Sequence, residues 1–191
     1  MTEPAPTIPT LQALATEART VNAANGWGLE FKPADLPKNI ALLHSEVTEA
    51  WSAISPDELV RELGDVIVRA LDLAELLSPG ALEAAWLATP YAGDLTLERA
   101  AWPDMFDPRV VSEPVAFLAL HSHISAALES YRKVKGDELM VSVVLGNLCD
   151  VIAYSKAIMK AREPGCVPSL IVQDIITANR ARAYRHGGRR S

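Results

Sequence analysis

Hydrophobic side chains recur along most of this chain at the three- and four-residue spacing of α-helices. No stretch shows the sustained alternation of apolar and polar residues that marks a half-buried strand, and the Val and Ile runs fall inside longer helical patterns. The pattern therefore predicts an all-α protein with five or six helices. The main helices are expected at residues 10–24, 36–54, 56–77, 113–134, 137–163 and from about 169 onward.

Capping and turn residues predict the ends of the first three helices. The first helix should stop at Asn25-Gly26, a pair that readily adopts the left-handed conformation after a helix. Ser55-Pro56-Asp57-Glu58 has the form of a capping box with proline at the first helical position, so the third helix begins there. The second and third helices then form a hairpin with almost no loop.

The chain is predicted to contain two helical units joined by a long connection. Residues 1–78 hold the first unit, and residues 113–191 restart the helical pattern. The connection, residues 79–112, is rich in Pro and Trp, with short helical pieces expected near residues 81–88 and 95–101. The two units together are interpreted as one compact body.

The second unit repeats the first hairpin. Residues 42–50 (LLHSEVTEA) align with 119–127 (ALHSHISAA), and residues 62–67 (ELGDVI) align with 147–152 (NLCDVI). Apolar positions match, whereas acidic positions do not. The counterparts are His123 for Glu46, Ala126 for Glu49, Asn147 for Glu62 and Asp150 for Asp65. Chance similarity between two amphipathic hairpins is the alternative, but the shared Leu-His-Ser and Asp-Val-Ile triplets favour a duplication with one degenerate copy.

Four carboxylates carry the candidate chemistry: Glu46, Glu49, Glu62 and Asp65. Each pair is spaced by three residues and so projects from one face of its helix, a spacing that by itself is typical of solvated surface. Glu46 and Glu49, however, share their arc with Leu42 and Ala53 and have no Lys or Arg one turn away. Antiparallel packing across the turn at Ser55 can bring both pairs together.

A cluster of this kind predicts a bound metal ion. Mutual repulsion would destabilise the carboxylates unless a cation held them, and oxygen-only ligands favour Mg²⁺ or Mn²⁺ over zinc. Such a cation, bound also to substrate phosphate oxygens, can neutralise developing charge and lower the pKa of an attacking water. Arg69 could neutralise part of the acidic stripe of its own helix, which also holds Glu58, Glu62, Asp65 and Asp72.

Composition and charge exclude several classes of protein. The 191 residues with 49% hydrophobic content suffice for one core. The net charge is −6, although residues 179–191 carry five arginines and no acid, and this distribution argues against duplex nucleic acid as the main ligand. Residues 1–9 do not resemble a signal peptide, and no stretch approaches the roughly 20 apolar residues of a membrane span. With Cys149 and Cys166 interpreted as reduced thiols, a cytoplasmic protein without a membrane partner is expected.

The acidic pairs and their surroundings resemble the MazG-like, all-α nucleoside triphosphate pyrophosphohydrolase superfamily, including its small phage and bacterial members. The resemblance rests on Glu46-x-x-Glu49 and Glu62-x-x-Asp65, on the flanking segments 36–46 and 62–74, and on the ending 179–189. It covers residues 21–77 and the last dozen residues well. Relatives with one hairpin assemble as dimers or tetramers, so the resemblance implies a bundle of two hairpin repeats, an internal pseudo-dimer that is monomeric or forms a homodimer.

The resemblance also implies an activity, the cleavage of a (d)NTP between the α and β phosphates to give (d)NMP and pyrophosphate. Glu46, Glu49, Glu62 and Asp65 would bind Mg²⁺ or Mn²⁺, and one of them would help to activate water. The expected substrate contacts are Trp27, Lys38, Arg69, Asp72, Asn179, Arg182 and Arg185. Two alternatives remain open: a phosphoribosyl-ATP pyrophosphohydrolase-like enzyme, and a non-catalytic nucleotide-sensing or partner-binding module.

Several of these side chains have ordinary alternatives. Trp27 could stack on a base or pack in the core, and Lys38 could be a solvated lysine. Arg182 and Arg185 could close over a triphosphate or belong to a frayed basic end.

Two further features are expected to be structural. Trp51 is predicted to lie in the core. His44 and His121 occupy matching positions in the two repeats, which favours a shared packing or hydrogen-bonding role over catalysis.

Overall fold

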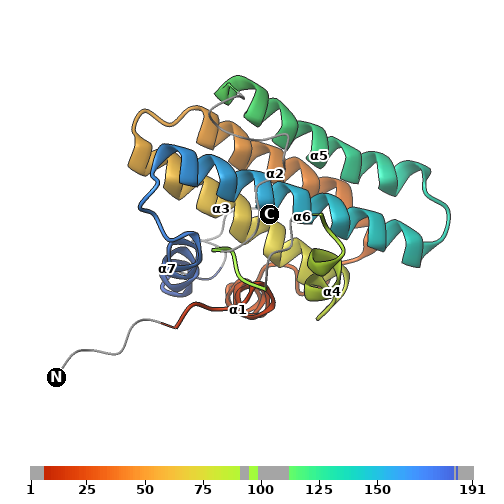
Figure 1. Cartoon of the computed structure of the whole chain (residues 1–191). Helices are drawn as coiled ribbons and strands as arrows, with labels where there is room; N and C mark the ends of the chain where they lie inside the picture. The colour runs from red at the N-terminus through yellow and green to blue at the C-terminus, as the bar shows by residue number, and fades with distance from the viewer. Residues whose placement is uncertain (1–6, 91–94, 99–111, 183, 185–191) are drawn as a thin grey trace.

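The structure, a computed structural model, describes residues 7–90, 95–98, 112–182 and 184 (Figure 1). All regular structure within these residues is helical, and none of them lies in a strand, which confirms the prediction of an all-α protein. The helices are α1 (Leu11–Ala24), the short 3-10 helix η1 (Pro33–Asp35), α2 (Leu36–Trp51), α3 (Pro56–Leu77), α4 (Leu82–Leu87), α5 (Glu113–Lys133), α6 (Asp137–Arg162) and α7 (Pro168–Arg180).

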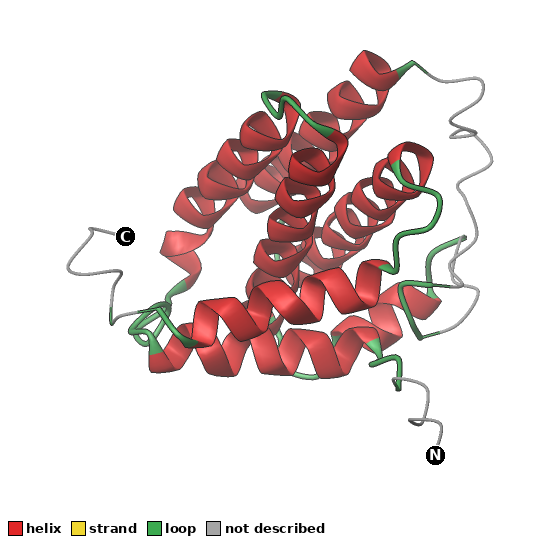
Figure 2. Cartoon of the chain, turned by 90° about the vertical axis from the view of Figure 1, so that its left-hand side faces the viewer, coloured by secondary structure: helices red, strands yellow, loops and turns green. Residues whose placement is uncertain are grey.

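Four long helices form the centre of the fold. The helices α2 and α3 make one antiparallel hairpin and α5 and α6 make another, with α2 packed on α5 and α3 packed on α6. The helices α1 and α7 lie side by side against α3, and Figure 2 shows this pair running across the hairpins. The short helix α4 packs on α6 beside α1. One continuous core therefore joins both hairpins.

The start of α3 follows the capping pattern that the sequence predicts. Ser55 Oγ accepts a hydrogen bond of 3.2 Å from the backbone N–H of Glu58. The Glu58 carboxylate in turn accepts from the N–H of Ile54 at 2.8 Å, one residue before the cap itself. Because this bond takes the Ile54 N–H, α2 ends at Trp51, three residues earlier than predicted. The tight hairpin is nevertheless formed.

Trp51 and Ile54 differ from their predicted places. Trp51 is 50% exposed and Ile54 is 94% exposed, so the prediction of a buried Trp51 is wrong. Trp51 is the last residue of α2, and Ile54 lies in the turn that follows it. The ring of Trp51 still packs edge-on against Phe117 of α5, with ring centroids 5.2 Å apart.

The connection between the two units is described only in part. A short helix occurs as α4, where residues 81–88 predict one. Residues 95–98 form turns and bends, so the helix predicted over residues 95–101 is wrong in that part, and residues 99–101 lie outside the described residues. Leu97 is fully buried, and the carbonyl of Leu95 accepts a hydrogen bond of 2.8 Å from the N–H of Leu11.

Helix α6 is long and apolar enough, by length and composition, to cross a membrane. Of its most apolar window, however, 67% is buried inside the structure. Its closest neighbours are α3 and α5, so it is the central helix of the bundle. A core helix has the same length and composition, which makes this feature weak grounds for a membrane span.

The two hairpins correspond in burial as well as in sequence. Three apolar positions of α2 are buried and so are their counterparts on α5: Leu43 and Leu120, Val47 and Ile124, Ala50 and Ala127. The intervening residues Glu46 and His123 are both half-buried. The same sequence positions therefore face the core in each hairpin.

His44 and His121 meet where α2 packs on α5. Their Nδ1 atoms are 2.7 Å apart, and their rings stack with centroids 5.0 Å apart. The predicted shared packing and hydrogen-bonding role is thereby confirmed. Because one Nδ1 must donate and the other accept, the pair requires at least one neutral imidazole. Burial lowers the pKa of both side chains, and His121 lowers that of His44 further.

The lowered pKa values predict a loss of stability in mild acid. A histidine whose pKa is lower in the folded state binds protons preferentially in the unfolded state, so the free energy of unfolding falls as the pH drops below about 6.5. Carboxyl groups with raised pKa values, such as Asp65, oppose this fall in both proteins, so urea titrations at pH 7.5 and 5.5 should show a less favourable change on acidification in the wild type than in the double variant His44→Gln/His121→Gln. Equal changes in both proteins would contradict the assignment.

Candidate metal centre

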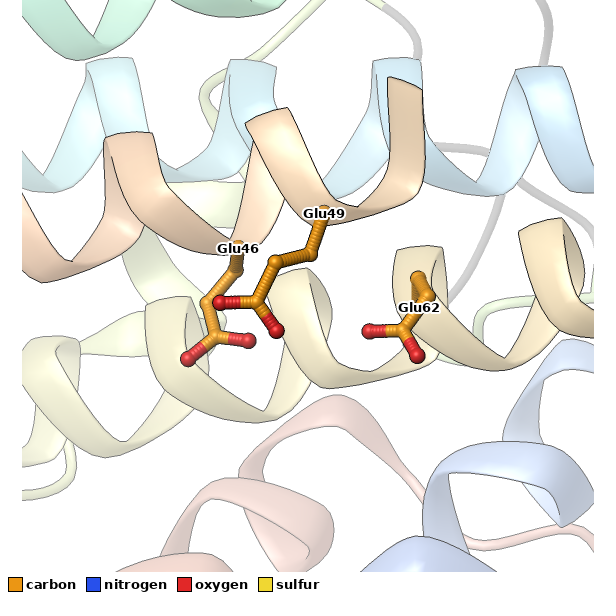
Figure 3. A group of neighbouring side chains, drawn as sticks. All are labelled: Glu46, Glu49 and Glu62. Atoms are coloured by element: carbon orange, nitrogen blue, oxygen red, sulfur yellow. The ribbon is translucent and has the colours of Figure 1, made fainter. Parts of the chain in front are cut away.

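Three carboxylates converge between α2 and α3 (Figure 3). Glu46 and Glu49 extend from α2, and Glu62 extends from α3. One carboxylate oxygen of each lies within 4.8 Å of the other two. The turn at Ser55 explains this geometry, because Glu49 and Glu62 are six and seven residues from it on antiparallel helices. The hairpin thus brings together three of the four predicted ligands.

Asp65 lies one turn beyond Glu62 on α3 and outside that group of three. Burial raises the pKa of Asp65 to about 6, and the charges of Glu46 and Glu62 act in the same direction. The pKa of Glu62 is also raised, first by burial and then by Glu49 and Glu46. Asp65 therefore lies close enough to the cluster for the charges of Glu46 and Glu62 to raise its pKa. The positive charges nearby offset this effect only in part.

Arg69 supplies a direct positive contact to the cluster. Its Nε and Nη2 atoms donate hydrogen bonds of 2.8 and 2.5 Å to the same oxygen, Oε1 of Glu46. The Arg69 side chain is 39% exposed, whereas that of Glu46 is 14% exposed. The sequence predicts that Arg69 neutralises acids of its own helix, whereas its ion pair in the structure reaches across to Glu46 of α2.

Asp72 lies farther along α3, and its carboxylate is engaged with α1. Arg19 of α1 donates to Oδ1 of Asp72 at 2.7 Å and also to the backbone carbonyl of Trp27. The ion pair ties α1 to α3 and holds the loop that carries Trp27, whose residue is half-exposed. Sequence reasoning missed Arg19, although its place four residues after Ala15 on the buried side of α1 implies a need for an acidic partner.

The end of α7 docks against the end of α1. The carbonyl of Asn179 accepts a hydrogen bond of 2.8 Å from Asn25 Nδ2, and Arg180 pairs with Glu17 at 2.8 Å. The ring of Tyr184 lies against Gly26, whose φ of +84° and lack of a side chain permit this contact. The start of the basic ending is therefore anchored to the first helix.

The remaining predicted substrate contacts differ in their distance from the cluster. Arg182 is exposed, and its charge lowers the pKa of Asp65, so Arg182 lies near the acidic cluster. Lys38 is exposed in the first turn of α2, about 12 Å along the helix axis from Glu46. Arg185 lies outside the described residues.

Gly64 allows α7 to approach α3 beside the acidic residues. A Cβ atom at Gly64 would lie 2.5 Å from Cδ1 of Ile175 and 3.2 Å from Cγ2 of Ile171. The lack of a side chain at residue 64 therefore leaves room for Ile175 and Ile171 of α7, the helix that leads to Arg182.

Replacing Gly64 tests this packing. Gly64→Ala should lower the free energy of unfolding by about 1–3 kcal/mol, because Ile175 must move. Gly146→Ala in α6 is a matched control, since a Cβ there meets nothing within 4 Å, and it should raise stability by up to about 1 kcal/mol. Urea unfolding of both variants gives the measurement, and equal effects would disprove the tight contact.

The second hairpin has a different arrangement at the corresponding place. His123 Nδ1 lies 3.1 Å from Oδ2 of Asp150, and the His123 ring lies 4.9 Å from the ring of Tyr154. Asn147 also forms a hydrogen bond with His123. Among the described residues, Glu46, Glu49 and Glu62 form the one group of three or more potential ligand side chains close enough for a single ion.

Comparison with known proteins gives no assignment, because no family model, no curated protein and no solved structure matches the chain.

Proposed function

We propose that this protein is a divalent-cation-dependent nucleoside triphosphate pyrophosphohydrolase, cleaving (d)NTP to (d)NMP and pyrophosphate at one site on the α2–α3 hairpin. The observation that carries the proposal is the convergence of Glu46, Glu49 and Glu62, with oxygens within 4.8 Å and Asp65 beside them. The sequence resemblance at the same four residues supports the choice of reaction.

The donor set fits Mg²⁺ or Mn²⁺. All the donors are carboxylate oxygens, which hard cations prefer, and neighbouring ligands of such an ion lie about 3–4 Å apart. One oxygen of each of Glu46, Glu49 and Glu62 already lies within 4.8 Å of the other two, close to what a shared ion requires. When bound, the ion would neutralise charge on the phosphates and lower the pKa of the attacking water.

In this proposal, different residues bind the ion, accept a proton and bind the phosphates. Glu46, Glu49 and Glu62 would hold the ion, and Asp65 would complete the ligand set or accept a proton from water. Arg182 and Arg69 would bind phosphate oxygens, since guanidinium groups bind them in bidentate fashion.

Three other predicted contacts have less direct roles in this proposal. Asp72, which is paired with Arg19, would act by positioning the loop of Trp27, the expected platform for the base. Asn179 would anchor the basic ending through Asn25, and Lys38 would act at longer range.

The activity can be tested by measuring pyrophosphate release from a panel of dNTPs, NTPs and phosphoribosyl-ATP with Mg²⁺ or Mn²⁺. Glu49→Gln should lower release roughly 100-fold, because it removes one ligand of the ion. Glu138→Gln, at an exposed position in the first turn of α6, should leave release unchanged.

The other possible outcomes of this experiment distinguish the proposed function from its alternatives. Release from phosphoribosyl-ATP alone would favour the phosphoribosyl-ATP pyrophosphohydrolase-like alternative. Nucleotide binding without any release would favour a nucleotide-sensing module. Equal release by wild type and Glu49→Gln would contradict the proposed site.

We also propose that the chain folds as an internal pseudo-dimer of two hairpin repeats. Equivalent helices of the two hairpins pack on each other, α2 on α5 and α3 on α6, as they would in a two-fold symmetric dimer. His44 and His121, which occupy equivalent positions, contact each other, as residues near such an axis must. The matching burial of the two hairpins supports the same proposal.

Sedimentation equilibrium tests the pseudo-dimer. Because the second hairpin takes the place of a partner subunit, the protein should sediment as a 20.6 kDa monomer or as its dimer across the micromolar range. An obligate tetramer, the state open to relatives with a single hairpin, would count against it.

A further inference from the structure

Arg69 binds Oε1 of Glu46, one of the three carboxylates that would hold the proposed metal ion. Two of its donors bind the same oxygen of Glu46, and the pair spans from α3 to α2. Glu46 is one of the three side chains that converge in Figure 3. The Arg69 side chain is the more exposed of the two, 39% against 14% for Glu46, so Arg69 has access to solvent.

The packing of the helices fixes this contact. In the second hairpin, His123 corresponds to Glu46, and Tyr154 corresponds to Arg69. Arg69 and Tyr154 each lie four residues after an aspartate that is present in both hairpins, Asp65 and Asp150. The rings of His123 and Tyr154 are also in contact, with centroids 4.9 Å apart. The same two positions therefore meet in both hairpins, with quite different side chains, so the Arg69–Glu46 contact follows from the helix geometry.

The charges do not favour simultaneous occupation of Glu46 by two cations. Arg69 compensates the charge of one carboxylate, while Glu49 and Glu62 bring two further negative charges within 4.8 Å of it. A divalent ion between Glu46, Glu49 and Glu62 would neutralise more of the cluster but would repel the guanidinium at short range. Binding of the ion must therefore weaken the bond from Arg69 to Glu46.

We propose that Arg69 is an internal counterion that holds Glu46 until a divalent cation displaces it, and that the released guanidinium then binds a phosphate of the substrate. Metal binding and phosphate binding are in this way coupled through one side chain. The inference rests on the proposed function and adds to it the order in which the groups assemble.

Mn²⁺ affinity without nucleotide, measured from the electron paramagnetic resonance signal of free Mn²⁺, tests the displacement. Arg69→Gln is compared with Arg61→Gln, a matched control on the same helix, because exposed Arg61 lowers the pKa of Glu62 and Asp65 through space. Both variants lose one positive charge near the cluster. Arg69→Gln should bind Mn²⁺ about fivefold more tightly than Arg61→Gln, since it alone removes a competing ion pair.

A second measurement tests the release toward phosphate. At saturating Mn²⁺, the affinity for a triphosphate analogue with a non-hydrolysable α–β bridge should fall about tenfold in Arg69→Gln and stay close to wild type in Arg61→Gln. Arg69→Lys, which keeps the charge without the two-donor fork, should lie between wild type and Arg69→Gln for both ligands. Thermal unfolding confirms that each variant is folded.

The outcomes separate the two proposals. Equal or weaker Mn²⁺ binding by Arg69→Gln relative to Arg61→Gln, in a wild type that binds Mn²⁺ and releases pyrophosphate, overturns the counterion role alone. A wild type that neither binds Mn²⁺ nor releases pyrophosphate overturns the proposed function and the counterion role with it.

Discussion

The short turn at Ser55 constrains the candidate metal centre more than any other contact. It forces α2 and α3 to run antiparallel with almost no loop, and so holds Glu46 and Glu49 opposite Glu62. Burial, and then repulsion among these carboxylates, raises the pKa of Glu62 and Asp65, and both effects oppose folding of the hairpin with its carboxylates charged. The apolar packing of the hairpin on α5, α6 and α1 must offset this cost.

Most of the fold could be predicted because its signals are local. Helical spacing, the Ser55 cap and the Asn25-Gly26 stop depend on neighbouring residues only, and the helices that they predict are present. Trp51 and Ile54 show the limit of such reasoning. Periodicity places Ile54 on the apolar stripe, but α2 ends at Trp51 and Ile54 falls in the turn, where it is 94% exposed. Trp51 is still helical, yet it is half-exposed and packs its ring edge-on against Phe117 instead of entering the core.

The candidate site could be predicted in part for the same reason. Glu46, Glu49 and Glu62 follow from helix spacing and the tight turn, whereas the roles of Asp72 and Arg69 depend on partners far away in sequence. Asp72 is paired with Arg19, 53 residues earlier, and Arg69 with Glu46, 23 residues earlier. No pattern within one helix predicts which of two nearby acids an arginine selects.

The His123–Asp150 pair has a consequence for how this protein can change by mutation. In a symmetric homodimer, every substitution occurs twice and alters both sites together. Here both hairpins belong to one chain, so a substitution at residue 123 leaves residue 46 untouched. In the proposed pseudo-dimer, the first hairpin can therefore keep its group of acidic residues, while the second carries the His123–Asp150 pair at the corresponding place.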